Sequence, residues 1–367
     1  MANQEGVYIV VAVFVRLKER LGGLERRLLR ILSYIEQKYP DFAFRLVCYG
    51  CESVEKNFIK YQEELNVAFK DVIFIKNPRE MIKYVFFEDN SRLFVHGVCA
   101  RDIFIDILAK MKGVKILGLL VSYEIYNLEK FWSTIGLSNK IRIIFLWLAL
   151  SIVDFIDTIY PKSLGLLKKI FSGKTITLTP KTFTDLSKFE PAPKRRKIVF
   201  LAARMDKPKN PMLMVNAVGI VAGQLRKENY VVYMCGCGPD LDDMIAFCRK
   251  NRIDDILVFP GYVDPSVVLP DAEVFCSLQA LENYPSQALV EAIACGCYII
   301  ATDVGDTRVI VDDSFGKLIS ANQQDLAEAL LEYVFMDPKS KERIVKNARS
   351  FAERNFSIDG VADHYLE

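Results

Sequence analysis

The chain has 367 residues, of which 51% are hydrophobic and 26% are charged, as in an ordinary globular protein. This length exceeds what one hydrophobic core usually serves, so two domains are expected. The nine cysteines are odd in number and lie mostly within apolar runs, which favours a reducing compartment over a disulfide-bonded secreted scaffold. Cys48 and Cys51 form one CYGC pair, but no second pair stands at zinc spacing, so an accident at a strand end is favoured over redox chemistry and no metal site is expected.

Charge is distributed unevenly along the chain. Residues 1–180 hold 26 Lys and Arg against 19 Asp and Glu, whereas residues 181–367 hold 22 against 27. A basic N-terminal half suggests an anionic partner or surface. It lacks the dense basic patches and the aromatic-basic motif of nucleic-acid binders, so nucleic acid is not an expected partner.

The first half alternates short β-branched or aromatic runs with helical patterns. The run at 7–15 has no basic segment before it and no small-residue cleavage site after it, so we interpret it as a buried strand and not as a signal peptide. An amphipathic helix is expected at 24–39. Such alternation predicts parallel β-α units, with further strands at 44–49, 72–75, 92–96 and 115–121.

Residues 140–159 are apolar over more than one helical face. Their longest uncharged run, 143–153, has 11 residues, too few for a membrane span of about 20. A core helix is one interpretation. The alternative is a face that lies on lipid, assisted by three nearby lysines: Lys162, Lys168 and Lys169.

The second half repeats the β-α pattern after a segment at 179–197 that is rich in proline and charge. We interpret this segment as a linker between an acceptor-side domain at 1–180 and a second domain at 181–345. A helix at about 345–367 is expected to pack back onto the first domain. The predicted strands of the second domain lie at 197–203, 231–236, 256–261, 273–278 and 297–302.

The loop after the first of these strands carries two cations. LAARMDKPKNP places Arg204 and Lys209 just before Asn210 and Pro211, a good N-cap residue and a residue favoured in the first turn of a helix. Two cations beside a helix N-terminus suit a diphosphate. A solvated basic loop is the alternative.

Two further loops carry glycines that would let a ligand approach the backbone. CGCGPD contains Gly236 and Gly238, and FPGYV spans residues 259–263. In parallel α/β sheets ligands bind at the carboxyl ends of the strands, where all these loops lie.

The richest segment is LENYPSQALVEAIACGCYIIATDVGDTR, residues 281–308. Asn283 can cap a helix whose first turn would hold Pro285, with Glu291 roughly 12 Å deeper along the axis. A carboxylate there suits two ribose hydroxyls, although an ordinary exposed helix glutamate is the alternative. Gly305 supplies another close backbone approach.

In this order the motifs resemble those of the retaining glycosyltransferases of family four, over about residues 198–320. The resemblance implies the GT-B fold: two facing, Rossmann-like, doubly wound α/β domains with an interdomain cleft. RLGGLER, with Gly22 and Gly23, resembles the glycine-rich loop of that family, which contacts the donor phosphate. The implied reaction moves a sugar from a UDP- or GDP-type donor with retention at the anomeric carbon, usually without a metal and with no separate cofactor.

The resemblance also implies roles for single residues. Arg204 and Lys209 would neutralise the diphosphate as the nucleotide leaves, and Glu291 would bind the ribose. The backbone would hold the base at Gly238, Tyr262 and Val263, and the phosphates at Tyr284, Pro285 and Ser286.

Two features depart from the family pattern. Its paired glutamates have seven residues between them, but eight separate Glu282 from Glu291, so either Glu282 or Asn283 would contact the donor sugar. The position of a histidine common in the family falls at Val121 or Ser122. His96, at a strand end, could instead hydrogen-bond the donor or acceptor, or be a satisfied loop histidine. Glu124 is a further polar candidate on the acceptor side.

The sequence therefore favours a glycosyltransferase that extends a lipid-linked glycan in bacterial-type surface polysaccharide assembly. Its expected location is cytoplasmic, or peripheral on the inner face of the cytoplasmic membrane, where an anionic surface would attract the basic half. One alternative is a donor-binding subunit without catalytic activity. The other is a nucleotide-sugar epimerase, which the presence of only two histidines argues against.

Overall fold

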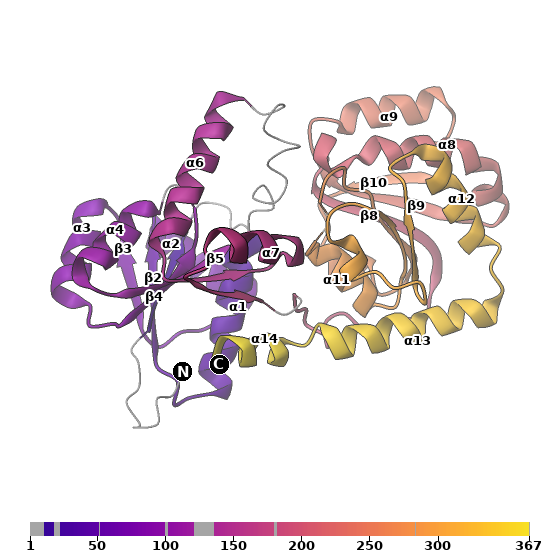
Figure 1. The fold of residues 1–367 in the computed structure, drawn as a ribbon. Coiled ribbons are helices and arrows are strands. Elements are labelled where there is room, and N and C mark those ends of the chain that lie inside the picture. The colour runs from indigo at the N-terminus through magenta and orange to yellow at the C-terminus, as the bar shows by residue number, and fades with distance from the viewer. Residues whose placement is uncertain are drawn as a thin grey trace. The chain divides into compact units, whose positions relative to one another are not determined.

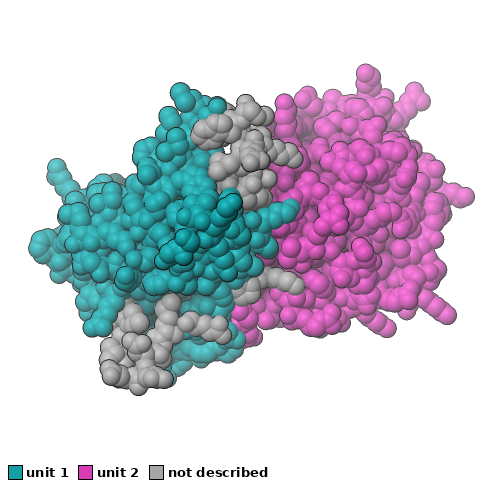
Figure 2. Space-filling model, in the orientation of Figure 1, with its two compact units in different colours: residues 1–180, 361–367 teal, residues 181–360 magenta. Residues whose placement is uncertain are grey.

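The computed structural model describes residues 11–17, 23–50, 52–99, 102–120, 136–179, 182–282 and 284–366. The chain divides into two compact units, one of residues 1–180 with 361–367 and one of residues 181–360. Figure 1 labels many of their helices and strands, and Figure 2 distinguishes the two units by colour.

The first unit is built on a seven-stranded parallel sheet. Its order is β3-β2-β1-β4-β5-β6-β7, so the chain builds one side from β1 to β3 and then returns to pair β4 with β1. The strands are β1 (Val11–Arg16), β2 (Phe44–Tyr49), β3 (Val72–Ile75), β4 (Leu93–Gly97), β5 (Lys115–Leu120), β6 (Phe155–Thr158) and β7 (Thr175–Leu178).

Helices follow most of these strands. Their ends carry the expected local signals: the side chain of Asn77 accepts hydrogen bonds from the first turn of α3, and Gly113 ends α4 in the left-handed conformation. The helices are α1 (Gly23–Lys38), α2 (Val54–Leu65), α3 (Pro78–Lys83), the π-turn η1 (Tyr84–Glu88), α4 (Ile103–Lys112), α6 (Leu137–Ile152), α7 (Pro161–Ile170) and α14 (Ile358–Leu366).

One apolar core cluster of this unit lies between the sheet and a layer of helices. Phe14 and Phe94 of neighbouring strands pack with their ring centroids 4.7 Å apart, and α3, η1, α4 and α6 bury their inner faces against the same cluster. The segment at 140–159 is therefore not one helix, as its apolar pattern suggested. It divides into α6, which ends at Ile152, and the separate strand β6.

The second unit is a six-stranded parallel sheet of order β10-β9-β8-β11-β12-β13. Its strands are β8 (Arg195–Arg204), β9 (Val231–Cys237), β10 (Leu257–Gly261), β11 (Ala272–Ser277), β12 (Tyr298–Thr302) and β13 (Gly316–Ile319). Its helical elements are the 3-10 turns η3 (Lys207–Lys209) and η4 (Thr307–Val309) and the helices α8 (Pro211–Lys227), α9 (Leu241–Lys250), α10 (Pro265–Val268), α11 (Gln287–Ala294), α12 (Gln323–Val334) and α13 (Pro338–Asn355).

The end of the chain departs from the expected single helix at 345–367. Helix α13 belongs to the second unit, where it packs against α11 and Arg349 Nη1 donates to the carbonyls of Phe189 at 2.7 Å and Leu186 at 3.1 Å. Only residues 361–367 belong to the first unit. There Tyr39 Oη donates to Asp363 Oδ1 at 2.8 Å, and His364 Nε2 lies 3.1 Å from Asp157 Oδ1.

Candidate functional site

The carboxyl edge of the second sheet brings together most of the predicted site residues. The strand order reverses between β8 and β11, and ligands of doubly wound sheets bind where such a reversal opens the carboxyl edge. The loops after these two strands contact each other, because Ala280 N donates to the carbonyl of Pro208 at 3.0 Å. Thr302 Oγ1, at the end of β12, donates a 2.7 Å hydrogen bond to the carbonyl of Gln279 in the loop after β11.

The loop after β8 presents Lys209 at the start of α8. Lys209 closes the turn η3 and is half-buried, and Pro211 takes the first position of α8 as predicted. Asn210 occupies the N-cap position with φ +53°, and its described side chain makes no capping bond, so the expectation of a side-chain cap is wrong. Arg204 ends β8 opposite Cys237, but its side chain lies outside the described part.

Glu282 connects two loops of the site. Its side chain is 8% exposed, and its Oε1 accepts hydrogen bonds from the backbone N–H of Tyr284 at 2.9 Å and of Asp306 at 3.1 Å. Gly305 has φ +56°, and a Cβ there would lie 2.1 Å from the same carboxylate. Position 305 must therefore be glycine, because any larger side chain would clash with the Glu282 carboxylate. The carboxylate thus determines the backbone conformation of this loop. Asn283, the other candidate for the donor-sugar contact, lies outside the described residues.

Helix α11 begins later than the sequence suggested. Ser286 is its N-cap residue and Gln287 its first residue, so Pro285 precedes the helix and does not occupy its first turn. Glu291 lies about one turn inside, roughly 6 Å along the axis and not two turns. It is buried, and its Oε1 accepts a 3.1 Å hydrogen bond from Gln287 Nε2, one turn earlier.

The glycines after β9 serve the packing of neighbouring loops. A Cβ on Gly238 would lie 2.2 Å from the carbonyl oxygen of Met205, and Met205 N donates to the carbonyl of Cys237 at 2.8 Å. Close approach of the loop after β8 therefore accounts for the glycine at position 238. The sequence had suggested that this glycine is needed for close approach of a ligand. Gly236 has φ +136°, a value that also favours glycine.

The loop after β10 presents an exposed aromatic ring. Tyr262 is 73% exposed beside a half-buried Val263, and Gly261 turns the chain with φ +74°. This arrangement leaves the Tyr262 ring exposed to solvent after the carboxyl end of β10.

His96 does not reach a ligand site in the first unit. Its side chain is 1% exposed, with Nε2 2.6 Å from Asp106 Oδ1 and Nδ1 3.0 Å from the carbonyl of Gly97. Burial lowers the pKa of His96, but the hydrogen bond and charge of Asp106 outweigh it and hold the pKa above its ordinary value. The expected contact of His96 with the donor or acceptor is therefore wrong. The alternative holds: both ring nitrogens have hydrogen-bonding partners within the protein.

The remaining first-unit candidates are mostly not described. Gly23 begins α1 directly after the first loop, whereas Gly22 lies outside the described residues, as do Val121, Ser122 and Glu124.

A charged cluster that sequence reasoning missed stands at the carboxyl edge of the first sheet. Arg16 Nη2 donates to Asp102 Oδ1 at 2.6 Å, and the guanidinium carbon lies 5.2 Å from the ring centre of Tyr49. Cys99 Sγ donates to Asp102 Oδ2 at 2.9 Å. Burial lowers the pKa of Arg16, but the charge of nearby Asp102 raises it, and the net pKa of Arg16 lies above its ordinary value. The pair spans 86 positions, so no local pattern reveals it.

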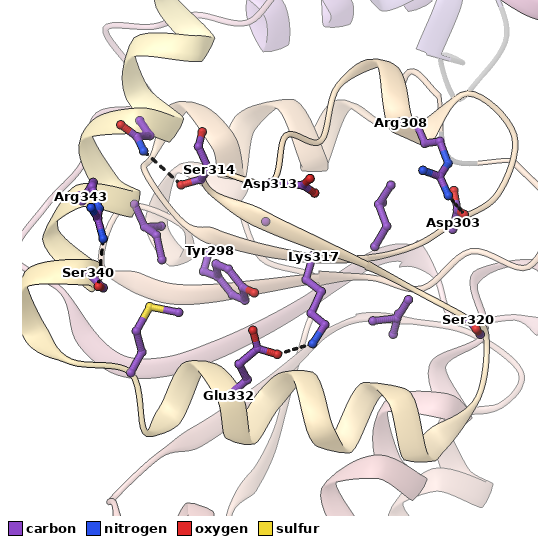
Figure 3. A pocket seen from close by; sticks show the side chains of 16 residues that line it. Tyr298, Asp303, Arg308, Asp313, Ser314, Lys317, Ser320, Glu332, Ser340 and Arg343 are labelled. Carbon is purple, nitrogen blue, oxygen red and sulfur yellow. Dashed lines mark hydrogen bonds and ion pairs between the residues drawn. The ribbon is translucent and has the colours of Figure 1, made fainter.

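A cavity of about 900 Å³ lies elsewhere on the second unit, along β13 and between α12 and α13 (Figure 3). Four of its charged groups pair with each other: Lys317 contacts Glu332, and Arg308 contacts Asp303. None of the predicted donor-site residues lines it, so it is not the candidate site. Among the described residues, no group of three or more His, Cys, Asp or Glu side chains is placed to hold a metal ion.

Residues 182–351 match the family model of the glycosyl transferases group 1. Among curated proteins of Campylobacter jejuni, the chain is 24% identical over 225 residues to a GalNAc-α-(1→4)-GalNAc-α-(1→3)-diNAcBac-PP-undecaprenol α-1,4-N-acetyl-D-galactosaminyltransferase, covering 60% of this chain and 59% of that protein. It is 23% identical over 160 residues to an N-acetylgalactosamine-N,N'-diacetylbacillosaminyl-diphospho-undecaprenol 4-α-N-acetylgalactosaminyltransferase, covering 43% and 42%. The chain therefore spans less than two thirds of each of these relatives.

The fold extends over the whole chain. HepE from Anabaena, solved in complex with UDP and glucose, superposes with a TM-score of 0.73 at 13% identity and covers 98% of both chains. Sucrose-phosphate synthase from Thermosynechococcus elongatus superposes with a TM-score of 0.74 at 15% identity and covers 97% of each. The predicted GT-B architecture, two parallel-sheet α/β domains, is confirmed, and the predicted resemblance is confirmed at the level of group 1 glycosyl transferases.

Proposed function

We propose that this chain, whose residues 182–351 carry the glycosyl transferases group 1 region, moves an N-acetylhexosamine from a UDP donor to a lipid-linked glycan with retention at the anomeric carbon. The observation that carries the proposal is the constellation at the carboxyl edge of the second sheet. There a backbone hydrogen bond joins the loops after β8 and β11. The Glu282 carboxylate accepts bonds from the backbone N–H of Tyr284, just before α11, and of Asp306.

The chemistry that this edge would perform is departure of a diphosphate. The bond between the anomeric carbon and the diphosphate oxygen breaks, and its electron pair stays with the nucleotide. The acceptor hydroxyl oxygen then bonds to the anomeric carbon, and its proton passes to an oxygen of the departing diphosphate. Lys209 and Arg204 would stabilise the negative charge that develops on the diphosphate. This lowers the barrier because that charge is larger in the transition state than in the bound donor.

The other residues would orient the donor. Glu291 would accept hydrogen bonds from the ribose hydroxyls, and the loop at Tyr262 and Val263 would hold the base. The amides at the start of α11 would meet the phosphates, since the N-terminus of a helix attracts anions. Glu282 would act on the donor sugar chiefly by holding the backbone of Gly305 and Asp306 in place.

The choice of donor and acceptor rests on the similar proteins. Both Campylobacter relatives are named for transfer of N-acetylgalactosamine in α linkage to undecaprenol-linked glycans, and HepE binds UDP. An α linkage is the product of retention when the nucleotide sugar is itself α-configured. A role in bacterial-type surface polysaccharide assembly, at the cytoplasmic face of the membrane and without a metal, is part of the same proposal.

A panel of nucleotides and donors tests the proposal. UDP is expected to raise the melting temperature more than GDP, ADP, CMP or TDP, and UDP-GalNAc or UDP-GlcNAc should release UDP in the presence of an undecaprenyl-diphosphate-linked sugar. Chelation of divalent metals should leave the rate unchanged. Binding of UDP without any turnover would instead support a donor-binding subunit that lacks catalytic activity.

A further inference from the structure

Helix α6 is apolar on two opposite faces. Its inner face, with Ile143, Leu146 and Leu150, is buried. A surface helix normally turns polar side chains outward, but the outward face of α6 exposes five large apolar side chains at helical spacing: Leu137, Ile141, Ile144, Phe145 and Leu148.

The neighbouring elements extend this apolar surface. Helix α4 contacts both α6 and η1, and all three bury their inner faces in one core cluster. The outward side chains of α4 and η1 include two that are highly exposed, Phe87 at 81% and Met111 at 70%; the others are Phe86, Phe104 and Ile107. We call the exposed apolar side chains of α6, α4 and η1 the outer apolar face.

The surroundings of the outer apolar face are basic. Across α3, η1, α4, α6 and α7 there are nine Lys and Arg residues and three Asp and Glu. Three of these cations are paired: Lys83 with Glu88, Lys110 with Asp154 and Lys112 with Asp89. One of the three acids, Asp106, is buried against His96, so it contributes little to the surface field. Lys168 and Lys169 of α7 and Arg142 of α6 are exposed.

This combination fits the interface of an anionic lipid membrane. An apolar face with lysine and arginine at its border is typical of helices that lie in the plane of the headgroups. None of the described helices has the length and hydropathy needed to cross a bilayer. A symmetric contact with a second copy would bring the same excess of cations together from both sides, which costs free energy.

The position of α6 relates this face to the carboxyl edge of the first sheet. The C-terminal end of α6 is followed directly by β6, and Asp154 N bonds to the carbonyl of Ile116 near the start of β5. Since α6 therefore ends at the amino edge of the sheet, its N-terminal end, where Leu137 is 74% exposed, points toward the carboxyl edge.

We propose that the outer apolar face docks the first unit on an anionic phospholipid surface, with α6 lying in the headgroup region and its N-terminal end toward the carboxyl edge. The benefit of such docking rests on the proposed function, because an acceptor attached to a membrane lipid would then approach this edge from the surface. The docking itself depends only on the outer apolar face and its basic border.

Vesicle sedimentation tests the docking directly. The purified full-length chain should bind vesicles of phosphatidylcholine mixed with phosphatidylglycerol at low salt, and bind pure phosphatidylcholine more weakly. The double variant Ile144→Ser/Leu148→Ser should bind the mixed vesicles at least about tenfold less, since it removes two half-exposed apolar side chains. The control Ile220→Ser/Val267→Ser changes two exposed apolar side chains of the second unit and should bind like the wild type.

Two measurements keep the outcomes distinct. Circular dichroism should show that both double variants keep the wild-type melting temperature within a few degrees. If Ile144→Ser/Leu148→Ser instead converts a wild-type dimer to a monomer and no vesicle binding is seen, the face is a protein interface and the proposal is wrong.

Activity in solution separates this inference from the proposed function. Hydrolysis of UDP-sugar without vesicles should be equal in the wild type and in Ile144→Ser/Leu148→Ser. Hydrolysis without vesicle binding would overturn the docking and leave the transferase proposal intact. Vesicle binding that depends on the outer apolar face, without turnover of any donor, would support the docking and count against the transferase.

Discussion

Lys209 is the cation of the site whose position is best defined. It closes η3 directly before α8, whereas Lys207, at the start of the same turn, is exposed. Lys209→Ala should reduce turnover by about a hundredfold or more, the size of effect seen when one group that stabilises a transition-state charge is removed. Lys207→Ala should leave turnover within about a factor of three, since an exposed charge is largely screened by solvent.

Steady-state kinetics and thermal melting distinguish the two roles of Lys209. Both lysine variants should melt within a few degrees of the wild type. A loss of stability in Lys209→Ala that matches its loss of turnover would show that this cation is structural.

Glu282 and Gly305 should behave as a coupled pair. Gly305→Ala places a Cβ against the Glu282 carboxylate at φ +56° and should destabilise the protein by about 2 kcal/mol or more, part of it from the left-handed conformation. In a Glu282→Ala background, Gly305→Ala should cost only the part that comes from the left-handed conformation, about 1 kcal/mol. Urea unfolding of the four proteins of this cycle measures the coupling, and strictly additive effects would contradict the contact.

The buried pair of His96 and Asp106 should make the stability of the first unit depend on pH. Because the pKa of His96 is raised in the folded state, its stabilisation is fully present below the unfolded-state value of about 6.5 and is lost as pH rises through the folded-state pKa. The melting-temperature gap between the wild type and Asp106→Asn should therefore be wider at about pH 5.5 than at about pH 8.5. A gap that widens with rising pH would contradict this assignment.

At the scale of single elements, α6 depends on a lysine that follows it in the chain. Lys174 Nζ donates to the carbonyls at the end of α6, to Ser151 O at 2.7 Å and to Leu150 O at 2.9 Å. Burial lowers the pKa of Lys174, so keeping this side chain charged costs free energy. Lys174→Met should destabilise the first unit by about 1–2 kcal/mol because these carbonyls lose their donor.

Hydrogen exchange locates the effect of Lys174→Met. Faster exchange is expected in α6 and β6, with the second unit unchanged. The matched control is Lys169→Met, which removes an exposed lysine of α7 and should leave exchange in α6 unaltered.

The local pattern of the sequence was sufficient for most strands and for the loops at their ends. Short runs rich in apolar residues, such as 44–49 and 273–278, predict buried strands, and Gly50 ends the first of them. The strand β6 was missed because FIDT at 155–158 is short and half polar, and it follows an apolar helix without a strong break. The start of α11 was misplaced because Asn283 and Pro285 give a capping signal that competes with the actual cap, Ser286.

Side-chain roles were harder to predict where partners are distant. His96 had the position of a ligand-binding residue, but its partner Asp106 comes from the next helix. Glu282 could be chosen as a site residue from spacing, whereas its bond to Asp306 depends on how two loops meet. Arg16 and Asp102 had no signal at all, since their contact arises only when β4 returns to pair with β1.

At the scale of the whole molecule, the two units divide the work of the proposed reaction. The second unit carries the edge that we propose binds the diphosphate, and residues 182–351, which match the glycosyl transferases group 1 model, lie in this unit. The first unit carries the outer apolar face and a basic excess, which suit an acceptor attached to lipid. The uneven charge of the two halves of the sequence reflects this division.

The most direct test of the central claim is the anomeric configuration of a product made with UDP-N-acetylhexosamine and an undecaprenyl-diphosphate-linked sugar. Nuclear magnetic resonance of the product should show one new α-linked residue, formed together with one UDP, and Lys209→Ala should abolish both signals. A β-linked product would contradict retention, and the absence of UDP release from every donor would contradict transferase activity itself.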